Sequence, residues 1–446
     1  MNLPSTEIPQ LSSVNSRSLR SALRPRVDGH VVKVVGLLAE GFCPGAAVGD
    51  LLEIHTSGAI VPAEVVGLRD GRVLMVGLGE LRGITLGAKI SHLGVAASVA
   101  CHQAMTGRIL DARGAILDTQ GGPLPGPHDL RPIYASAPSP LERSLIASPL
   151  PVGVRAIDGL LTLGRGQRIG ILAGAGVGKS TLLGAIAAHT EADIIVIGLV
   201  GERGREVGEF LQRTLSETAR RRCVAVVATS DRPALERTRA AFVATTIAEY
   251  FSSGGAHVLL LVDSLTRFAM AQRELGLSMG EPPATRGYPP SVFSLLPRLL
   301  ERAGSFTAGG SITGVYTVLV EGDDLSDPIS DAARSILDGH IVLSRDLASI
   351  GHYPAIDVLQ SISRVAASVV PESVNTAAQR VRTLVARIAE AKELVQIGAH
   401  VPGADPGLDR ALQLQPAVDA FLRQPASDPT SLAEIVKAMT ALAEAV

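Results

Sequence analysis

The stretch Leu172–Leu182, LAGAGVGKSTL, decides the fold of this chain. The apolar residues IGI, 169–171, precede it, and the helix-forming residues LGAIAAHT, 183–190, follow it. A buried strand, a glycine-rich turn and a helix in this order form a loop that binds phosphate groups. The pattern A-x-x-x-x-G-K-S runs from Ala173 to Ser180, with Ala173 in place of the usual first glycine. The sequence therefore predicts a nucleotide-binding α/β domain.

Each residue type in this loop has a physical reason to be there. Glycines let the backbone turn tightly and aim its N–H groups at phosphate oxygens, and the following helix adds its positive N-terminal end. Lys179 is placed to reach the terminal phosphates, and Ser180 to offer a hydroxyl to Mg²⁺. The predicted nucleotide-binding residues are Gly174, Ala175, Gly176, Val177, Gly178, Lys179, Ser180 and Thr181.

Hydrolysis needs carboxylates as well as a phosphate loop. Asp263 ends the apolar run HVLLLVD, so its carboxylate is expected at a strand tip beside the loop, as a partner of Mg²⁺ through water. Glu202 follows another apolar run and is the candidate for polarising the attacking water. The alternative for Glu202 is an acidic residue that begins a helix and pairs with Arg203 or Arg205.

Phosphoryl transfer also requires an arginine to stabilise charge on the phosphate oxygens, from the same chain or from a neighbour. Arg364 in SISRV and Arg267 in DSLTRF are the two candidates. Lone arginines are commonly solvated or paired in structural ion pairs, so the residues alone leave the choice between them open.

The pattern of strands and loops predicts the fold class. From about Pro151, apolar runs end in Gly, Ser or Asp and most precede a helical stretch, in RIGILAG, ADIIVIGLVGERG, RCVAVVATS and HVLLLVDSLTRFA. This alternation is typical of a largely parallel sheet that binds ligands at its strand ends.

Four regions are expected along the chain. Residues 1–24 form a flexible arm, and residues 25–95 alternate short Val, Leu and Ile runs with Gly and Asp turns, as in a small β-barrel or sandwich. Residues 96–368 hold the nucleotide-binding core and begin with a Pro- and Gly-rich linker. Residues 369–446 look helical, with an apolar stripe and a further segment that suit a helix hairpin.

Composition excludes several classes of protein. The 446 residues carry 41 Lys plus Arg against 43 Asp plus Glu, so no broad basic surface points to nucleic acid or to an anionic membrane. The N-terminus lacks a signal peptide, and no apolar run approaches the roughly 20 residues that span a bilayer, which predicts a cytoplasmic protein. Three distant cysteines fit neither a disulfide framework nor a zinc site.

Long stretches of the chain resemble the catalytic-subunit family of rotary ATP synthases and their secretion relatives. They include GERGREVGEF, LLLVDSLTRFAMAQRELG, GSITGVYTVLVEGDD and PAIDVLQSIS, Pro354–Ser363, which matches the family's signature. Within this family the sequence is most similar to the ATPase of bacterial type III secretion systems, through VVATSDRPALERTRAAFVATTIAEYF and PPATRGYPPSVFSLLPRLLERAG. The flagellar export branch is expected to carry Lys where Arg286 stands.

This resemblance implies a RecA-like core, ATP with Mg²⁺, and a homohexamer with nucleotide at the subunit boundaries. It implies that Glu202 is the catalytic carboxylate with Arg203 beside it, that Tyr353 stacks on adenine, and that Arg364 is an arginine finger for the neighbouring subunit. It also implies several partners: a stator-like regulator at the N-terminal arm, a central stalk protein, an export-gate membrane protein and chaperone–effector complexes. The barrel would form the collar of the ring. The whole protein would lie in the cytoplasm at the inner membrane, beneath the secretion apparatus.

The sequence leaves three alternative functions to consider. A flagellar export ATPase has the same chemistry. A ring helicase should show a basic, aromatic RNA-binding region, but only 3% of the residues are aromatic and the first hundred residues carry no basic patch. A non-catalytic nucleotide-binding scaffold predicts loss of Glu202 or Lys179, and both are present.

Overall fold

The computed structural model describes residues 28–118, 122–320, 322 and 324–445. The chain divides between Ala97 and Ser98 into two compact units, each with its own core. The predicted arm, residues 1–24, and its docking role lie outside the described residues.

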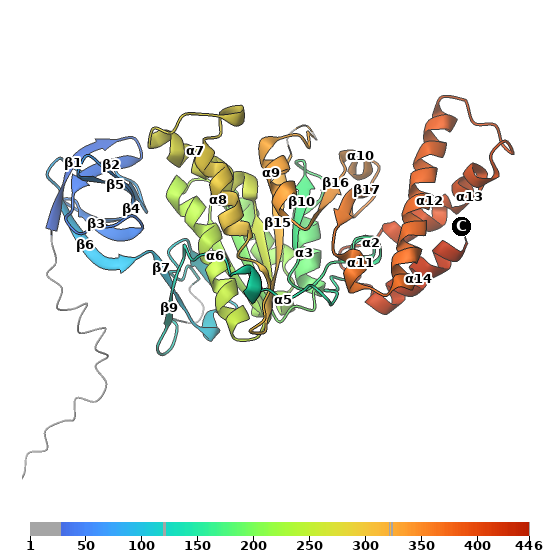
Figure 1. Cartoon of the computed structure of the whole chain (residues 1–446), viewed down its shortest axis with the longest axis horizontal. Helices are drawn as coiled ribbons and strands as arrows, with labels where there is room; N and C mark the ends of the chain where they lie inside the picture. The colour runs from blue at the N-terminus through green and yellow to red at the C-terminus, as the bar shows by residue number, and fades with distance from the viewer. Residues whose placement is uncertain (1–27, 119–121, 321, 323, 446) are drawn as a thin grey trace, which may run out of the picture. The chain divides into compact units, whose positions relative to one another are not determined.

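The first unit is a closed barrel of six antiparallel strands in the order β1-β2-β5-β4-β3-β6 (Figure 1). Inward-facing residues such as Leu52, Ile54, Met75 and Ile90 are fully buried and fill it. The sequence left a barrel and a sandwich open, and the pairing of β1 with β6 closes the barrel. Its strands are β1 (Asp28–Val35), β2 (Leu38–Phe42), β3 (Asp50–His55), β4 (Ile60–Arg69), β5 (Arg72–Gly77) and β6 (Lys89–Ala96).

The second unit is built on a sheet with the order β17-β16-β10-β15-β13-β11-β12-β8. Neighbours from β16 to β8 run parallel, β17 is antiparallel to β16, and the short β14 (Gly304–Ser305) is antiparallel to β15. This confirms the predicted α/β class. The strands are β8 (Ile109–Asp111), β10 (Arg168–Ala173), β11 (Ile194–Val200), β12 (Cys223–Ala228), β13 (His257–Asp263), β15 (Ser311–Leu319), β16 (Gly339–Leu343) and β17 (Ile356–Ser363).

Helices cover both faces of this sheet. On β11, Ile195 and Ile197 pack into the core that α3 (Lys179–His189) shares, whereas Gly198 faces α6 (Ala234–Ser253) so closely that a Cβ there would lie 3.2 Å from Ala244. The other α-helices of the core are α2 (Arg155–Leu160), α4 (Gly204–Glu209), α5 (Glu217–Arg221), α7 (Leu265–Ser278), α8 (Pro290–Leu300), α9 (Pro328–Ile336), α10 (Arg345–Ser349) and α11 (Ala366–Val369). The π-helix η3 (Phe210–Thr214) and the short 3-10 helices η1 (Gln103–Met105), η2 (Pro140–Glu142) and η4 (Thr285–Gly287) complete the described helices of this region.

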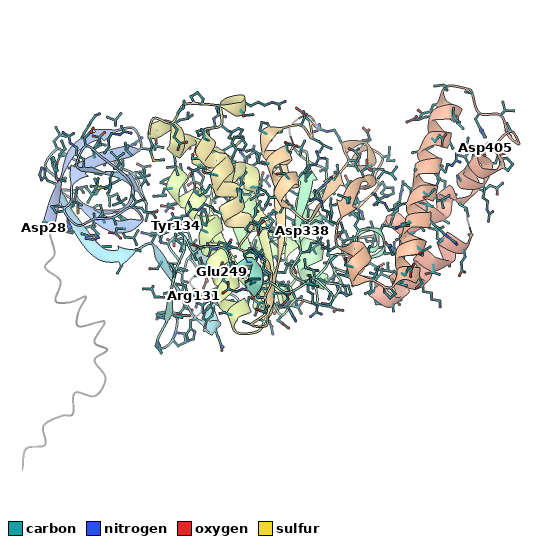
Figure 2. All side chains as sticks on the ribbon, in the orientation of Figure 1. Asp28, Arg131, Tyr134, Glu249, Asp338 and Asp405 are labelled. Carbon is teal, nitrogen blue, oxygen red and sulfur yellow. The ribbon has the colours of Figure 1, made fainter. Side chains whose placement is uncertain are left out.

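The predicted linker contains structure of its own. Within it, β9 (Asp129–Pro132) pairs with β7 (Ser98–Cys101). Just after β9, the Ile133 carbonyl accepts a hydrogen bond from the buried Arg302. The Arg302 guanidinium also binds Glu249, which Figure 2 labels, at 2.6 Å. A fully buried guanidinium is tolerated because a carboxylate, a carbonyl and a hydroxyl accept hydrogen bonds from its N–H groups.

The C-terminal region holds three helices, one more than the predicted hairpin: α12 (Glu372–Gln396), α13 (Pro406–Leu422) and α14 (Leu432–Glu444). All three contact α2 of the core (Figure 1). A Cβ on Gly159 of α2 would lie 3.1 Å from Phe421 and 3.2 Å from Ile435, so glycine is what permits this close packing. One continuous hydrophobic core therefore joins the sheet to the C-terminal helices.

Two predictions about the whole chain can be checked. Among the described residues, no helix is both long enough and apolar enough to cross a membrane. Cys43, Cys101 and Cys223 are each buried and free, so they act as small apolar side chains.

Candidate nucleotide-binding and catalytic site

The phosphate loop joins the end of β10 to α3. Gly176 and Gly178 have φ values of +79° and +90°, which favour glycine. Gly178 is the residue before the first turn of α3, and within the described part of the chain no side chain caps the helix there. The N–H groups of the first turn are therefore available to an anion, as a phosphate site requires.

Lys179 lies between two carboxylates at the carboxyl edge of the sheet. Its Nζ is 2.5 Å from Asp263 Oδ1 and 3.8 Å from Glu202 Oε1, and all three side chains are largely buried. Asp263 ends β13 and Glu202 follows β11, and these strands are neighbours. The strand order thus brings together three residues that are far apart in the sequence.

Thr317 is a member of the site that sequence reasoning missed. Its hydroxyl donates to Asp263 Oδ1 at 2.6 Å from the adjacent strand β15. This bond and the Lys179 bond hold the carboxylate in one orientation. No sequence pattern singles out Thr317, because it lies within an ordinary apolar strand.

Glu202 combines burial with an unused oxygen. Its Oε1 is buried and has no hydrogen-bond partner among the described residues. Burial raises the pKa of Glu202, while the nearby Lys179 charge acts in the opposite direction and the Asp263 charge adds to the increase. A carboxylate with a raised pKa and a free oxygen is suited to accept a proton.

The three arginines occupy different places. Arg267 on α7 packs against Gly201, and its buried Nε has no hydrogen-bond partner among the described residues. Its charge acts against the increase in the pKa of Glu202 that burial causes. Arg203 is exposed and forms an ion pair with Glu206 at 3.6 Å. Arg364 is exposed beyond β17, donates to the Arg334 carbonyl at 3.2 Å, and lines a different cavity from the nucleotide pocket. The structure therefore does not bring Arg364 to the phosphate loop of its own chain.

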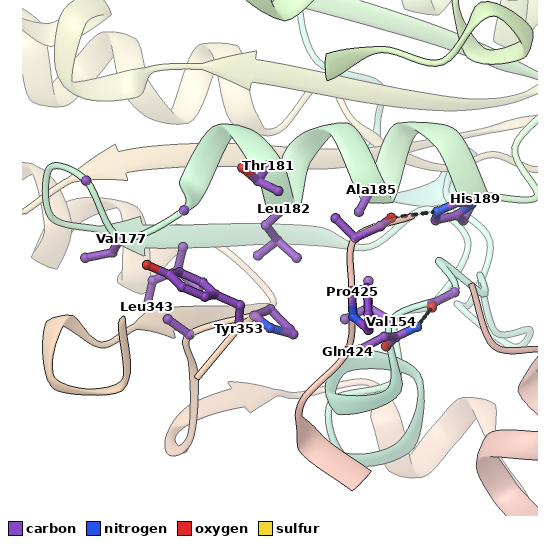
Figure 3. A pocket seen from close by; sticks show the side chains of 16 residues that line it. Val154, Val177, Thr181, Leu182, Ala185, His189, Leu343, Tyr353, Gln424 and Pro425 are labelled. Carbon is purple, nitrogen blue, oxygen red and sulfur yellow. Dashed lines mark hydrogen bonds between the residues drawn. The ribbon is translucent and has the colours of Figure 1, made fainter. Parts of the chain in front are cut away.

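A pocket of about 330 Å³ opens beside the loop (Figure 3). Tyr353 lies on one side, close enough that a Cβ on Gly178 would be 3.3 Å from its ring. Val177, Leu182 and Leu343 supply apolar walls, and Gln424 and Pro425 come from the segment between α13 and α14. The pocket has the size and the apolar lining that suit a planar base.

Comparison with known proteins identifies the family. Residues 153–363 match the nucleotide-binding domain of the ATP synthase alpha/beta family. The chain is 47% identical over 440 residues to the type 3 secretion system ATPase of Pseudomonas savastanoi pv. phaseolicola, which covers 98% of each protein. The chain belongs to the ATP synthase alpha/beta family.

Two branches of the ATP synthase alpha/beta family are near relatives. Residues 370–441 match the C-terminal domain of the type III secretion ATPase EscN. The flagellum-specific ATP synthase of Pseudomonas aeruginosa is 49% identical, with 92% of each chain covered. The assembled ATPase EscN from enteropathogenic E. coli, solved with its central stalk EscO, superposes with a TM-score of 0.86 at 44% identity, over 93% of this chain and 100% of that one.

Proposed function

We propose that this chain is a protein-export ATPase that energises type III secretion, releasing and unfolding chaperone-bound substrates and delivering them to an inner-membrane export gate. The observation that carries the chemistry is the Asp263–Lys179–Glu202 cluster at the end of a phosphate loop. The match of residues 370–441 to the EscN C-terminal domain supports the assignment to secretion.

Lys179 would bind the phosphates of ATP in place of its contact with Asp263. Its ammonium binds the terminal phosphate oxygens, and the free N–H groups at the start of α3 bind the others. The donor set fits Mg²⁺, because Ser180 offers an exposed hydroxyl and Asp263 a fixed carboxylate. Ser180 would hold Mg²⁺ directly and Asp263 would hold it through water, and the bound ion would supply positive charge against the charge that develops on the phosphate.

Glu202 polarises the attacking water. Its buried Oε1 has no competing hydrogen-bond partner in the described structure, so it is available to accept a proton from that water. Arg267 beside it favours the ionised form that this role requires.

Arg364 serves the site of a neighbouring copy. Its exposure and its distance from the pocket of its own chain fit a residue donated across a subunit boundary. Because one chain carries Glu202, Lys179 and Arg364 together, identical subunits complete each other's sites in a closed ring of six. The solved assembly of EscN with its central stalk supports this arrangement and a stalk partner.

Mixing two inactive variants tests this proposal. ATP hydrolysis is measured against protein concentration for the wild type, Glu202→Gln and Arg364→Ala, and then for the two variants together. We expect a specific rate that rises with concentration, a loss in each variant, and partial recovery on mixing, since some boundaries then pair an intact Glu202 with an intact Arg364. Activity that is independent of concentration and survives Arg364→Ala contradicts the shared site and returns Arg267 as the candidate.

Flagellar export is the second candidate, because the flagellum-specific relative is as similar as the secretion relatives. Deletion of the gene in its source bacterium separates the two. Loss of effector secretion with normal swimming supports the type III assignment, whereas loss of swimming with normal secretion supports the flagellar one. The same strain carrying a tagged copy tests the proposed cytoplasmic location at the inner membrane.

A further inference from the structure

Gln424 follows the last residue of α13 by two positions and is only 7% exposed. Its Oε1 accepts a hydrogen bond from the Arg155 backbone N–H at 2.8 Å. Its Nε2 donates to the Gly153 carbonyl at 2.7 Å and to the Asp428 carbonyl at 2.6 Å. The main-chain N–H of Gln424 donates to the Tyr353 carbonyl at 2.9 Å. The amide thus has both protons and its acceptor engaged within the protein.

The segments that Gln424 joins are the walls of the base pocket. Gly153, Val154, Tyr353, Pro425 and Ala426 all line this pocket, and Figure 3 labels Val154, Tyr353 and Pro425 around it. Another wall is α3, and the His189 ring on that helix contacts the Ala426 carbonyl at 3.1 Å. The buried side chain of Gln424 therefore ties residues 153–155 to the segment 424–428, and the main chain of the same residue adds Tyr353.

We propose that Gln424 is a positioning residue for the base of the bound nucleotide, an inference that rests on the proposed nucleotide-binding function. Its side-chain amide already forms hydrogen bonds with the backbone of the pocket walls, so it does not form hydrogen bonds with the edge of the base. Its side chain fixes the segment 424–428 against residues 153–155, and this keeps Pro425, Ala426 and the main-chain bond to Tyr353 in place for a planar ring. Without it these walls relax, while the phosphate loop keeps its own geometry.

Two ligands distinguish the contribution of the base pocket to binding from that of the phosphate loop. ADP carries a base, and inorganic tripolyphosphate does not. Their binding is measured by calorimetry for the wild type, Gln424→Met and Gln424→Asn, with Gln413→Ala as the control. Gln413 is an exposed glutamine on α13 and is not part of the pocket lining.

We expect Gln424→Met to weaken ADP binding about tenfold while the Kd of tripolyphosphate changes less than twofold. The KM for MgATP rises in parallel, with kcat at saturation within threefold of the wild type. Gln413→Ala should change none of these values. Equally weakened binding of ADP and tripolyphosphate overturns the proposal, because it means that Gln424 supports only the general fold. Unchanged ADP binding also overturns it, because it means that Gln424 does not position the walls of the pocket.

A measurement on the unaltered protein covers the case in which the variants fail to fold. Hydrogen exchange at residues 152–155 and 423–428 should slow when ADP binds and stay unchanged when tripolyphosphate binds. Equal protection by both ligands contradicts the positioning role. A wild type that binds neither ligand refutes the proposed function itself, so the two failures are distinguishable.

Discussion

Glu202 and Asp158 show how burial sets the chemistry of single carboxylates in this chain. Glu202 lies beside Lys179 at the phosphate loop, whereas Asp158 on α2 is surrounded by protein and accepts hydrogen bonds from the backbone N–H groups of Val152 and Gly153. Burial raises the pKa of both, but only Glu202 has an oxygen left free for a substrate.

Replacement of Glu202 should separate binding from hydrolysis. We expect Glu202→Gln to lower kcat by at least about a hundredfold, as loss of a general base does, and to leave ADP affinity within about threefold. Because the pKa of Glu202 is raised above 4.5, the wild-type rate should fall on the acid side at a higher pH than for an exposed glutamate. Steady-state kinetics against pH checks both points, and Glu206→Gln is the control from the next turn. Full activity in Glu202→Gln would exclude it as the base.

The raised pKa of Asp158 should make the free energy of unfolding depend on pH. Burial raises its pKa to about 7, against an ordinary value of 3.8. Between these values the folded state keeps the proton that the unfolded state has lost, so the free energy of unfolding falls as pH rises and levels off above the folded pKa. At about 1.4 kcal/mol per pH unit, the loss between pH 5 and pH 8 is about 2–3 kcal/mol.

Asp158→Asn should remove this dependence. Thermal unfolding of the wild type and the variant at a series of pH values shows it as a difference in Tm that shrinks by several degrees from pH 5 to pH 8. Parallel Tm curves for the two proteins would mean that Asp158 is ionised throughout this range.

The phosphate loop and α3 work as one element, because Gly178 ends the loop and directly precedes the first residue of the helix. In Gly178→Ala, a left-handed φ of +90° strains the alanine by about 1–2 kcal/mol, and the new Cβ meets the Tyr353 ring at 3.3 Å. We expect tripolyphosphate and ADP both to bind about tenfold more weakly, as calorimetry would measure. Gly204→Ala is the control, since a Cβ there meets nothing within 4 Å and φ is not in the left-handed region. Unchanged affinities in Gly178→Ala would mean that the loop adapts without loss.

At the scale of the whole molecule, the two units differ in how they depend on the rest of the chain. The barrel core consists only of barrel residues, while the core of the second unit runs from the sheet through α2 into the C-terminal helices. Residues 98–446 should therefore fold alone and bind ADP. A fragment of residues 98–369 should aggregate or bind a hydrophobic dye, because it exposes the surface of α2 that Phe421 and Ile435 cover. Circular dichroism, dye binding and calorimetry test both fragments, and tight ADP binding by the shorter one would contradict the role of the C-terminal helices.

The sequence by itself determined the features that consecutive residues encode. The glycine spacing and Lys179 identify the phosphate loop, and Asp263 and Glu202 are recognisable because each follows an apolar strand. The α/β class follows from the same alternation, and the structure confirms it.

The tertiary structure decided which distant residues meet. Strands β10, β15, β13 and β11 are neighbours in an order that differs from their order along the chain, so Thr317 reaches Asp263 without any local signal. The third C-terminal helix and the bonds of Gln424 to Gly153 and Tyr353 likewise depend on packing across more than 70 residues of sequence. Local patterns specify strands, turns and strand ends, whereas contacts between side chains depend on burial and strand order, which only the folded chain establishes.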